Sequence, residues 1–404
     1  MNYISSLVKD GQEDQLAYGK AIFLGLGFFI ITATWSLYNS FVPIFLKGFI
    51  RSESIIGLIM TFDNIAAITL QPYFGALSDN TDSKYGHRLP FLMIGIPIAA
   101  VFFALIPFAG NFWLLLTFLI IMNLAMSVFR SPTIALMPDL TPSPLRSKAN
   151  GVINFMGGIG AVLTYAVGSL LYDIHPAIPF ILFALLLVGV LILYLWKLKE
   201  PTRAKERERV NIIRVIVEVF QAKDKKILFV LFAIFFWFFG YSGVEAFFTL
   251  YGKEFLGIKE SAAAFSLTFF SLSFVIFAIP SGLLASKIGR KKTIIGGIIG
   301  LLVIFAGLVV IRDLLLIRLA LLIGGLFWAF ININSYPMVV DEAGKKIGAY
   351  TGVYYFFSTI PAILSPVFVG RLIEYFSYPV LFINSVVSFL IALVLMLKVE
   401  GRPG

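Results

Sequence analysis

The feature that most constrains this chain is a series of continuous apolar runs, each about 20 residues long. A run of this length crosses the hydrocarbon core of a bilayer, roughly 30 Å thick, as one α-helix. Strands of a membrane β-barrel would instead alternate apolar and polar residues over about ten positions. Of the 404 residues 59% are hydrophobic and only 13% charged, too few polar groups for the surface of a soluble protein. We therefore predict an all-α membrane protein.

The runs predict twelve transmembrane helices. We expect them at about 21–46, 55–76, 89–109, 112–138, 150–172, 177–197, 226–250, 262–285, 293–311, 314–338, 349–369 and 379–398. The longest hydrophilic stretch divides them six and six, so we predict two pseudo-symmetric six-helix bundles, 21–197 and 226–398. Residues 1–20 are expected to form a polar N-terminus without signal-peptide features, and 399–404 a short tail.

The hydrophilic stretch 198–225 is predicted to be a linker between the bundles. It starts with charged residues from Glu200 to Lys205, and its second part places four apolar residues on one helical face: Val210, Ile213, Val217 and Phe220. With basic neighbours, this pattern indicates an amphipathic helix on the membrane surface. A simple tether between the bundles is the alternative.

Lysine and arginine are distributed unevenly between the two sides of the predicted membrane. The termini and the even-numbered loops hold 24 of them, whereas the opposite loops hold 6. Short loops rich in basic residues stay in the cytoplasm, so we expect both termini there. The net charge of +10 is therefore a topology signal and does not indicate binding to nucleic acid.

Polar side chains are concentrated in eight of the twelve spans. The third, sixth and ninth spans contain almost no hydrogen-bonding side chains, and the twelfth has only three: Asn384, Ser385 and Ser388. A polar group in hydrocarbon costs several kcal/mol unless it has a partner, so we expect the polar spans to face a wet cavity or one another. This period of three predicts a transporter with alternating access and a small-molecule substrate near the membrane midplane.

Two segments of the first half recur in the second half. The segment 72–88 after the second span matches 280–291 after the eighth, once a four-residue insertion is allowed. The segment 138–151 after the fourth span likewise matches 341–352 after the tenth. The two matches in corresponding places indicate a duplicated half.

The pattern Gly75-x-x-x-Asp79 with Gly86-His87-Arg88 resembles the loop motif of the major facilitator superfamily. Residues 80–91, 130–139 and 354–366 resemble its glycoside–pentoside–hexuronide:cation symporters and the related sucrose:proton symporters. The resemblance covers essentially the whole chain. It implies the major facilitator fold and import of a sugar or glycoside together with a cation.

The resemblance also implies a cytoplasmic gate. Its predicted residues are Gly75, Asp79, Gly86, Arg88, Asp139 and Asp341. We expect Gly75 to permit close helix approach and Asp79 to meet the positive N-terminus of a neighbouring helix. Ordinary loop chemistry is the alternative.

Four charged residues lie well inside the spans: Asp63, Arg130, Glu245 and Arg318. Each costs roughly 2.5–3.5 kcal/mol to insert, so each needs a partner or a function. We predict that Asp63 binds the coupling proton and that Glu245 binds proton or substrate, the alternatives being a structural hydrogen bond and an outer-gate bond. Arg130 is predicted to bind substrate, or else to pair with Asp139. Arg318 is expected to extend toward water.

Melibiose-type members of the group carry paired aspartates in the second span. Ala67 and Gln71 stand one and two turns after Asp63 here, which favours the proton over sodium as the coupling cation.

Aromatic and amide side chains are the expected ligands of a sugar, because rings stack on its C–H face and amides bond its hydroxyls. With Arg130, the predicted substrate-binding residues are Trp35, Tyr38, Asn39, Trp328, Asn332 and Tyr354. The alternative is packing or anchoring at the membrane interface, since 16% of the chain is aromatic.

The leading prediction is a secondary transporter of the plasma or inner membrane that imports a sugar or glycoside by cation symport. It would use a proton or sodium gradient and no cofactor or metal. Efflux of amphipathic compounds by the same fold is the alternative. We do not expect an enzyme, because the chain has no cysteine, no His-x-x-x-His and no nucleotide-binding loop. Besides substrate and bilayer, no obligate protein partner is indicated.

Overall fold

The computed structural model describes residues 4–9, 12–200, 225–341 and 347–399. The predicted amphipathic helix of the linker lies outside these described residues. Within them, 12 helices are long and apolar enough to cross a membrane, which confirms the predicted all-α membrane protein.

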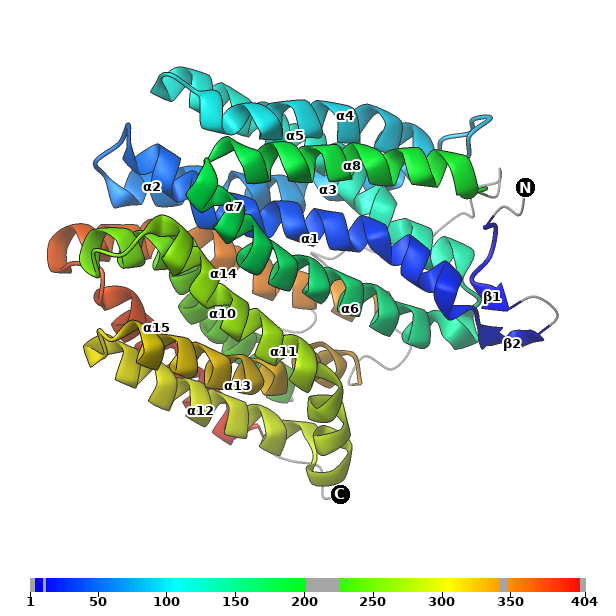
Figure 1. Ribbon diagram of the computed structural model, residues 1–404. Coiled ribbons are helices and arrows are strands. Elements are labelled where there is room, and N and C mark those ends of the chain that lie inside the picture. Colours follow the sequence, from blue (N-terminus) through cyan, green and yellow to red (C-terminus); the bar gives the residue numbers. More distant parts are fainter. Residues whose placement is uncertain (1–3, 10–11, 201–224, 342–346, 400–404) are drawn as a thin grey trace. The chain divides into compact units, whose positions relative to one another are not determined.

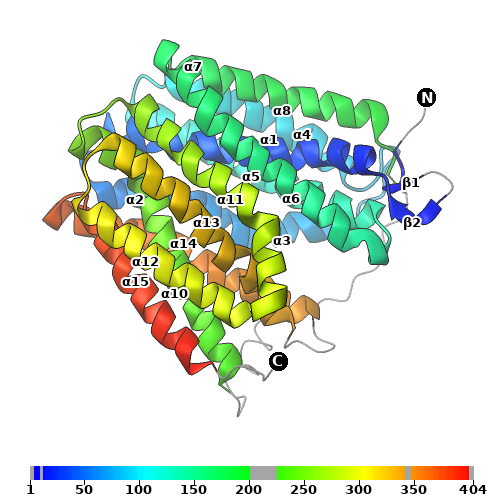
Figure 2. The same ribbon diagram turned by 60° about the horizontal axis from the view of Figure 1, so that its bottom comes forward.

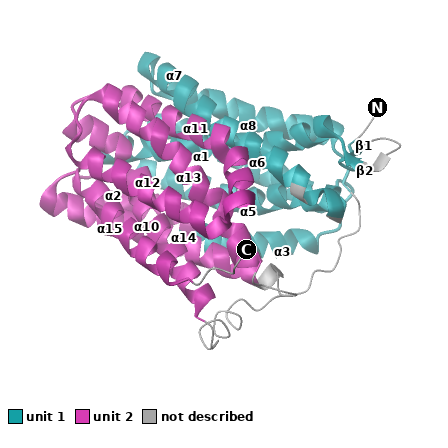
Figure 3. Cartoon of the chain, turned by 90° about the horizontal axis from the view of Figure 1, so that it is seen from below, with its two compact units in different colours: residues 1–49, 65–207 teal, residues 50–64, 208–404 magenta. Residues whose placement is uncertain are grey.

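The chain forms two compact units, shown in different colours in Figure 3. Unit 1 comprises 1–49 and 65–207, and unit 2 comprises 50–64 and 208–404. This division follows the two predicted bundles except at 50–64, a part of the second span that packs in unit 2.

The helices of unit 1 belong to the first six spans. They are α1 (Tyr18–Lys47), most of α3 (Phe62–Asp79), α4 (Leu89–Leu105), α5 (Phe112–Leu140), α6 (Arg146–Leu163), α7 (Ser169–Ile174) and α8 (Ala177–Lys197). Two 3-10 turns, η1 (Ile106–Phe108) and η2 (Ser143–Leu145), and a π-helical segment, η3 (Thr164–Gly168), complete them. In this unit α1 packs along α6 and α8, while α4 packs against α5 and α8 (Figure 1).

Unit 2 contains the remaining spans together with one short helix of the second span. Its elements are α2 (Glu53–Met60), α10 (Lys226–Leu250), the π-helical η4 (Tyr251–Phe255), α11 (Glu260–Ile288), α12 (Arg290–Val310), α13 (Leu314–Val340), α14 (Ile347–Phe376) and α15 (Val380–Lys398). Here α10 packs along α14 and α15, and α12 packs against α13 and α15 (Figure 2). These pairings repeat those of unit 1, as the duplicated sequence segments predict.

The second span is broken into two helices. Helix α2 ends at Met60, and the Thr61 amide donates to the Leu58 carbonyl at 3.1 Å, one residue tighter than an α-helical bond, before α3 starts at Phe62. Helix α2 packs against α14, where a side chain at Gly57 would place its Cβ 2.3 Å from the carbonyl oxygen of Pro366. The close approach of α2 to α14 explains why residues 50–64 group with unit 2.

A short β-hairpin precedes α1. Strand β1 (Val8–Lys9) pairs antiparallel with β2 (Gln12–Leu16). Just before it, the Leu7 amide donates to the Leu140 carbonyl at 2.8 Å, and the Leu7 side chain is fully buried. The N-terminal segment therefore lies across the end of α5, which its polar composition did not predict.

Candidate functional site

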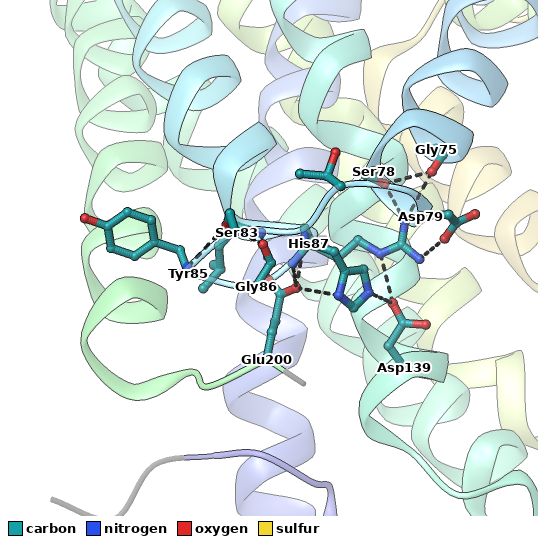
Figure 4. A network of polar contacts seen from close by, with 12 residues as sticks. Gly75, Ser78, Asp79, Ser83, Tyr85, Gly86, His87, Asp139 and Glu200 are labelled. Carbon is teal, nitrogen blue, oxygen red and sulfur yellow. Dashed lines mark hydrogen bonds and ion pairs between the residues drawn. The ribbon is translucent and has the colours of Figure 1, made fainter. Parts of the chain in front are cut away.

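The best-defined polar cluster of the described structure lies where α3 gives way to α4 in unit 1 (Figure 4). Its centre is Arg88, a side chain only 1% exposed. The guanidinium pairs with Asp79 and donates from Nε to Asp139 Oδ2 at 2.9 Å. It also donates to Ser78 Oγ and, at 3.3 Å, to the Gly75 carbonyl. Arg88 thus ties the end of α3 to the end of α5.

Glycine is required at the two predicted gate positions Gly75 and Gly86 for different structural reasons. A Cβ on Gly75 would lie 2.7 Å from Ser131 Oγ, so the glycine lets α3 approach α5 closely. Gly86 has φ +104°, a left-handed conformation that favours glycine. A Cβ there would also lie 2.5 Å from Glu200 Cβ. Four predicted gate residues of the first half are therefore brought together with Asp139, and Asp341 lies in unit 2.

Glu200 caps the N-terminus of α4. Its Oε2 accepts from the amides of His87 at 3.0 Å and Arg88 at 2.7 Å, and its Oε1 accepts from the Leu89 amide at 2.7 Å. The first amides of a helix lack intrahelical partners and carry partial positive charge, so a carboxylate there is stabilising. From the sequence we expected Asp79 to lie at the positive N-terminus of a neighbouring helix. In the structure Glu200 occupies that position at α4, and Asp79 pairs with Arg88 instead.

His87 lies between two carboxylates, as Figure 4 shows. Its Nε2 is 3.2 Å from Asp139 Oδ2, and its Nδ1 is 3.4 Å from Glu200 Oε2. The hydrogen bond with Asp139 raises the pKa of His87 above 6.5; burial and Arg88 oppose this, and Glu200 supports it. Burial also raises the pKa of Glu200, against the three amide bonds.

Asp341, the predicted gate residue of the second half, caps the end of α13. It forms an ion pair with Arg290, at the start of α12. The two side chains are 58% and 38% exposed, so this pair differs from the buried cluster around Arg88.

Three predicted substrate residues of the first half form one cluster in unit 1. The Trp35 and Tyr38 rings meet edge to face at 5.2 Å, and the Arg130 guanidinium lies 5.7 Å from the Trp35 ring centre. The Tyr38 hydroxyl accepts from Asn123 Nδ2 at 3.2 Å. Trp35 Nε1 is buried and has no hydrogen-bond partner within the described ranges. Asn39, on the same helix, is half-buried.

In unit 2 the predicted substrate residues fall into two aromatic groups. Trp328 stacks on Tyr241 at 4.3 Å and 8°, and Phe238 meets it edge to face. The Tyr354 hydroxyl is 3.0 Å from Ser335 Oγ, one turn beyond half-buried Asn332. Both groups combine ring faces with polar atoms.

The two predicted coupling acids both belong to unit 2. Asp63 lies in the first turn of α3, directly after the break at Thr61, is half-buried and accepts from Asn64 Nδ2 at 2.9 Å. Glu245 is half-buried in α10, one turn after Tyr241.

The start of α2 is fixed to the end of α14. Glu374 Oε1 accepts from Ser52 Oγ at 2.5 Å and from the Ser54 amide at 3.0 Å. The Tyr378 hydroxyl donates to Glu53 Oε1 at 3.2 Å. A Cβ on Gly370 would lie 2.5 Å from the Glu53 carbonyl oxygen, so this contact depends on glycine. These residues form a polar clasp within unit 2.

The sequence matches the family model described as Major Facilitator Superfamily over residues 24–366, with a second match over 254–404. The chain belongs to the Major Facilitator Superfamily. With its twelve apolar helices among the described residues, it is a multi-pass membrane protein of this family.

Among curated relatives, this facilitator is 26% identical over 157 residues to the sucrose transport protein SUC3 of Arabidopsis thaliana, covering 33% of this chain and 26% of that protein. It is 28% identical to the class H tetracycline resistance protein of Pasteurella multocida, covering 40% of each. With the class B tetracycline resistance protein of Escherichia coli it shares 23% identity, covering 70% of this chain and 71% of that protein. The chain thus spans less than half the length of the first two relatives.

Solved structures support the same fold. A variant of the nucleoside transporter NupG aligns with a TM-score of 0.77 at 15% identity, covering 94% of this facilitator and 100% of that chain. A bacterial homologue of the human lysosomal transporter Spinster aligns at 0.68 with 13% identity, covering 94% and 93%. These identities are too low to carry a substrate assignment.

Sequence reasoning missed three kinds of residue in this facilitator. It counted Glu200 as the start of a linker, gave His87 no role of its own, and left Ser52, Glu374 and Tyr378 unassigned. A weak signal existed for His87, because it stands inside the loop motif beside Arg88. Glu200 gave no such signal, because its partners are 111 to 113 positions away.

Proposed function

We propose that this transporter imports a sugar or glycoside by cation symport, with the proton as the coupling cation. The observation that carries the proposal is the cluster of Trp35, Tyr38 and Arg130. An apolar ring face lies beside a guanidinium and an indole N–H that has no partner among the described residues. A sugar offers an apolar C–H face and a rim of hydroxyls, so it matches this combination.

The relatives support both this proposal and one alternative. The sucrose transport protein favours a sugar, whereas the tetracycline resistance proteins favour efflux of an amphipathic compound. Arg130 discriminates between them, because a half-buried guanidinium donates well to hydroxyls and repels an amphipathic compound that carries a positive charge.

Uptake by the reconstituted protein tests the proposal. Proteoliposomes with an imposed inward proton gradient are expected to accumulate a labelled disaccharide and to lose this uptake when an ionophore removes the gradient. Export of tetracycline or a cationic dye, with no gradient-dependent uptake of any sugar tested, would instead establish the efflux alternative.

Trp35→Phe tests the site itself. It keeps the ring face and removes the indole donor, so we expect the half-saturation concentration to rise roughly 3- to 10-fold, the effect of one hydrogen bond, at an unchanged maximal rate. Trp113→Phe is the matched control, because Trp113 is 73% exposed in the first turn of α5. If both variants change the half-saturation concentration equally, Trp35 does not bind the substrate.

The coupling role of Asp63 has a separate test. Asp63→Asn is expected to abolish uphill accumulation and to retain exchange of substrate down its gradient. If the variant still concentrates substrate, the proton site lies elsewhere, and Glu245→Gln is the next variant to measure.

We further propose that the cluster around Arg88 acts as the inner gate. The excess of basic residues in the termini and even-numbered loops supports a cytoplasmic position for this end of unit 1. The cluster ties α3 and the loop after it to α5, so α3 stays fixed while these bonds hold.

A further inference from the structure

His87 is one of only two histidines in the chain, and it is nearly buried among charged groups. Three elements supply these groups: Arg88 at the start of α4, Asp139 at the end of α5, and Glu200 after α8. Asp79 of α3 joins through Arg88. Two potential cations and three carboxylates therefore meet in one cluster, in which His87, Arg88 and Glu200 are buried and the two aspartates are partly exposed.

The geometry around the imidazole favours its doubly protonated form. A carboxylate oxygen lies at each ring nitrogen, 3.2 Å from Nε2 and 3.4 Å from Nδ1. A neutral imidazole carries only one N–H, so one nitrogen lone pair would then face a carboxylate. Loss of the proton also leaves Arg88 as the only cation of this group beside three carboxylates, which weakens the cluster.

Glu200 is held in place independently of His87. The amide of Ile4 donates to the Lys197 carbonyl at 2.8 Å, and the amide of Lys199 donates to the Ile4 carbonyl at 3.0 Å. This backbone pairing fixes the chain directly before Glu200. Glu200 in turn fixes the first turn of α4 through three amides, and with it the position of Arg88.

We propose that His87 and Glu200 are positioning residues that make the Arg88 cluster sensitive to pH, intact when His87 is protonated and loosened when it is not. The role of this pH sensitivity in transport rests on the proposed function of the Arg88 cluster as the inner gate. The physical content of the proposal, a pH-dependent packing of α3 and α4, can be measured without any transport assay.

The sign follows from the pKa directions. The pKa of His87 is raised, most of all by its hydrogen bond with Asp139, so the folded protein retains this proton to higher pH than the unfolded chain. The contribution of His87 is complete below its ordinary value of 6.5 and is lost as pH rises through its raised pKa. An alkaline cytoplasm would therefore loosen the inner gate, and an acidic one would hold it closed.

The first test is the titration of His87 by nuclear magnetic resonance. In a ¹⁵N-histidine-labelled His175→Gln protein in nanodiscs, His87 gives the remaining histidine signals. We expect a titration midpoint above 6.5 that falls in Glu200→Gln and in Asp139→Asn. A midpoint at or below 6.5, or one that neither substitution moves, would overturn the proposal.

The second test measures packing with a single thiol. The chain has no cysteine, so Leu89→Cys introduces a unique probe at a side chain that is 3% exposed in the first turn of α4. With His87 present, maleimide labelling is expected to accelerate about tenfold between about pH 6 and about pH 8. This factor corresponds to the loss of one charge-assisted hydrogen bond when His87 gives up its proton. Dividing each rate by that of denatured protein at the same pH removes the titration of the thiol itself.

Two substitutions in the Leu89→Cys background give opposite expected results. His87→Gln should label fast at both pH values, whereas His87→Arg, which keeps the positive charge, should label slowly at both. If labelling of either variant accelerates with pH as much as labelling of the protein with His87, the proposal is overturned. If the titration and labelling behave as expected while no substrate is transported, the proposed function fails and this inference stands.

Discussion

The junction between α3 and α4 in unit 1 and the junction between α11 and α12 in unit 2 come from matching sequence segments, yet they differ in structure. In unit 1 the arginine of the motif, Arg88, is buried and bonded to two carboxylates. In unit 2 the arginine of the matching segment is Arg290, which stands in the place of His87 because Gly289 matches Gly86. Within the described ranges it forms an ion pair with Asp341, and both side chains are more than a third exposed.

The difference has two physical causes. Ser286 stands in the place of Asp79 and donates to the Leu283 carbonyl of its own helix, so this position supplies no carboxylate to the junction. Only Gly289 separates α11 from α12, whereas the longer loop of unit 1 turns Arg88 inward. A shared motif therefore predicts a shared turn but does not predict a shared buried network.

The largest contrast should come from removing the two arginines. Arg88→Ala leaves the partly buried carboxylates of Asp79 and Asp139 without their cation, and because Arg88 itself is buried we expect a loss of about 3 kcal/mol of unfolding free energy, at the low end of the cost of breaking a buried pair. Denaturant or thermal unfolding in detergent measures the loss. A loss equal to that of Arg290→Ala would contradict the difference between the two junctions.

The glycines before these arginines give a matched pair. Gly86 has φ +104° and Gly289 φ +90°, so alanine is strained by about 1–2 kcal/mol at either position. Only at Gly86 would the new Cβ also meet another side chain, Glu200, whereas nothing lies within 4 Å at Gly289. We expect Gly86→Ala to be the more destabilising in the same unfolding experiment, and equal effects would show that Glu200 moves away freely.

Glu200→Gln should have a smaller effect. The amide oxygen can still accept from the first turn of α4, but the negative charge at the helix N-terminus is lost, so we expect a loss of about 1 kcal/mol. Lys199→Gln is the control, because the neighbouring position contributes its backbone to the pairing with Ile4. If the two variants unfold alike, the charge of Glu200 has no special role.

Arg290→Gln should have the smallest effect. An exposed ion pair contributes about 0–1 kcal/mol and is weakened by salt. We expect a change below about 1 kcal/mol in unfolding free energy that shrinks further at high ionic strength. A loss as large as that of Glu200→Gln would mean that the exposed pair of unit 2 has a structural role that its exposure hides.

Much of the candidate site was readable from the sequence because its signals are local. Gly75, Asp79, Gly86 and Arg88 lie within one short segment, and Asp139 ends a recognisable span. The role of Glu200 was not readable, since its amide partners are more than 110 positions away. The clasp of Ser52 on Glu374, over 322 positions, was hidden for the same reason.

The sequence by itself determined the class of this protein, its twelve spans and the two matching halves, because an apolar run of about 20 residues can satisfy its backbone in a bilayer only as a helix. Only the tertiary structure decided that the second span breaks at Thr61, that residues 50–64 pack in unit 2, and that His87 lies between two carboxylates. These features depend on contacts between residues distant in sequence, and hydropathy along a chain carries no record of such contacts.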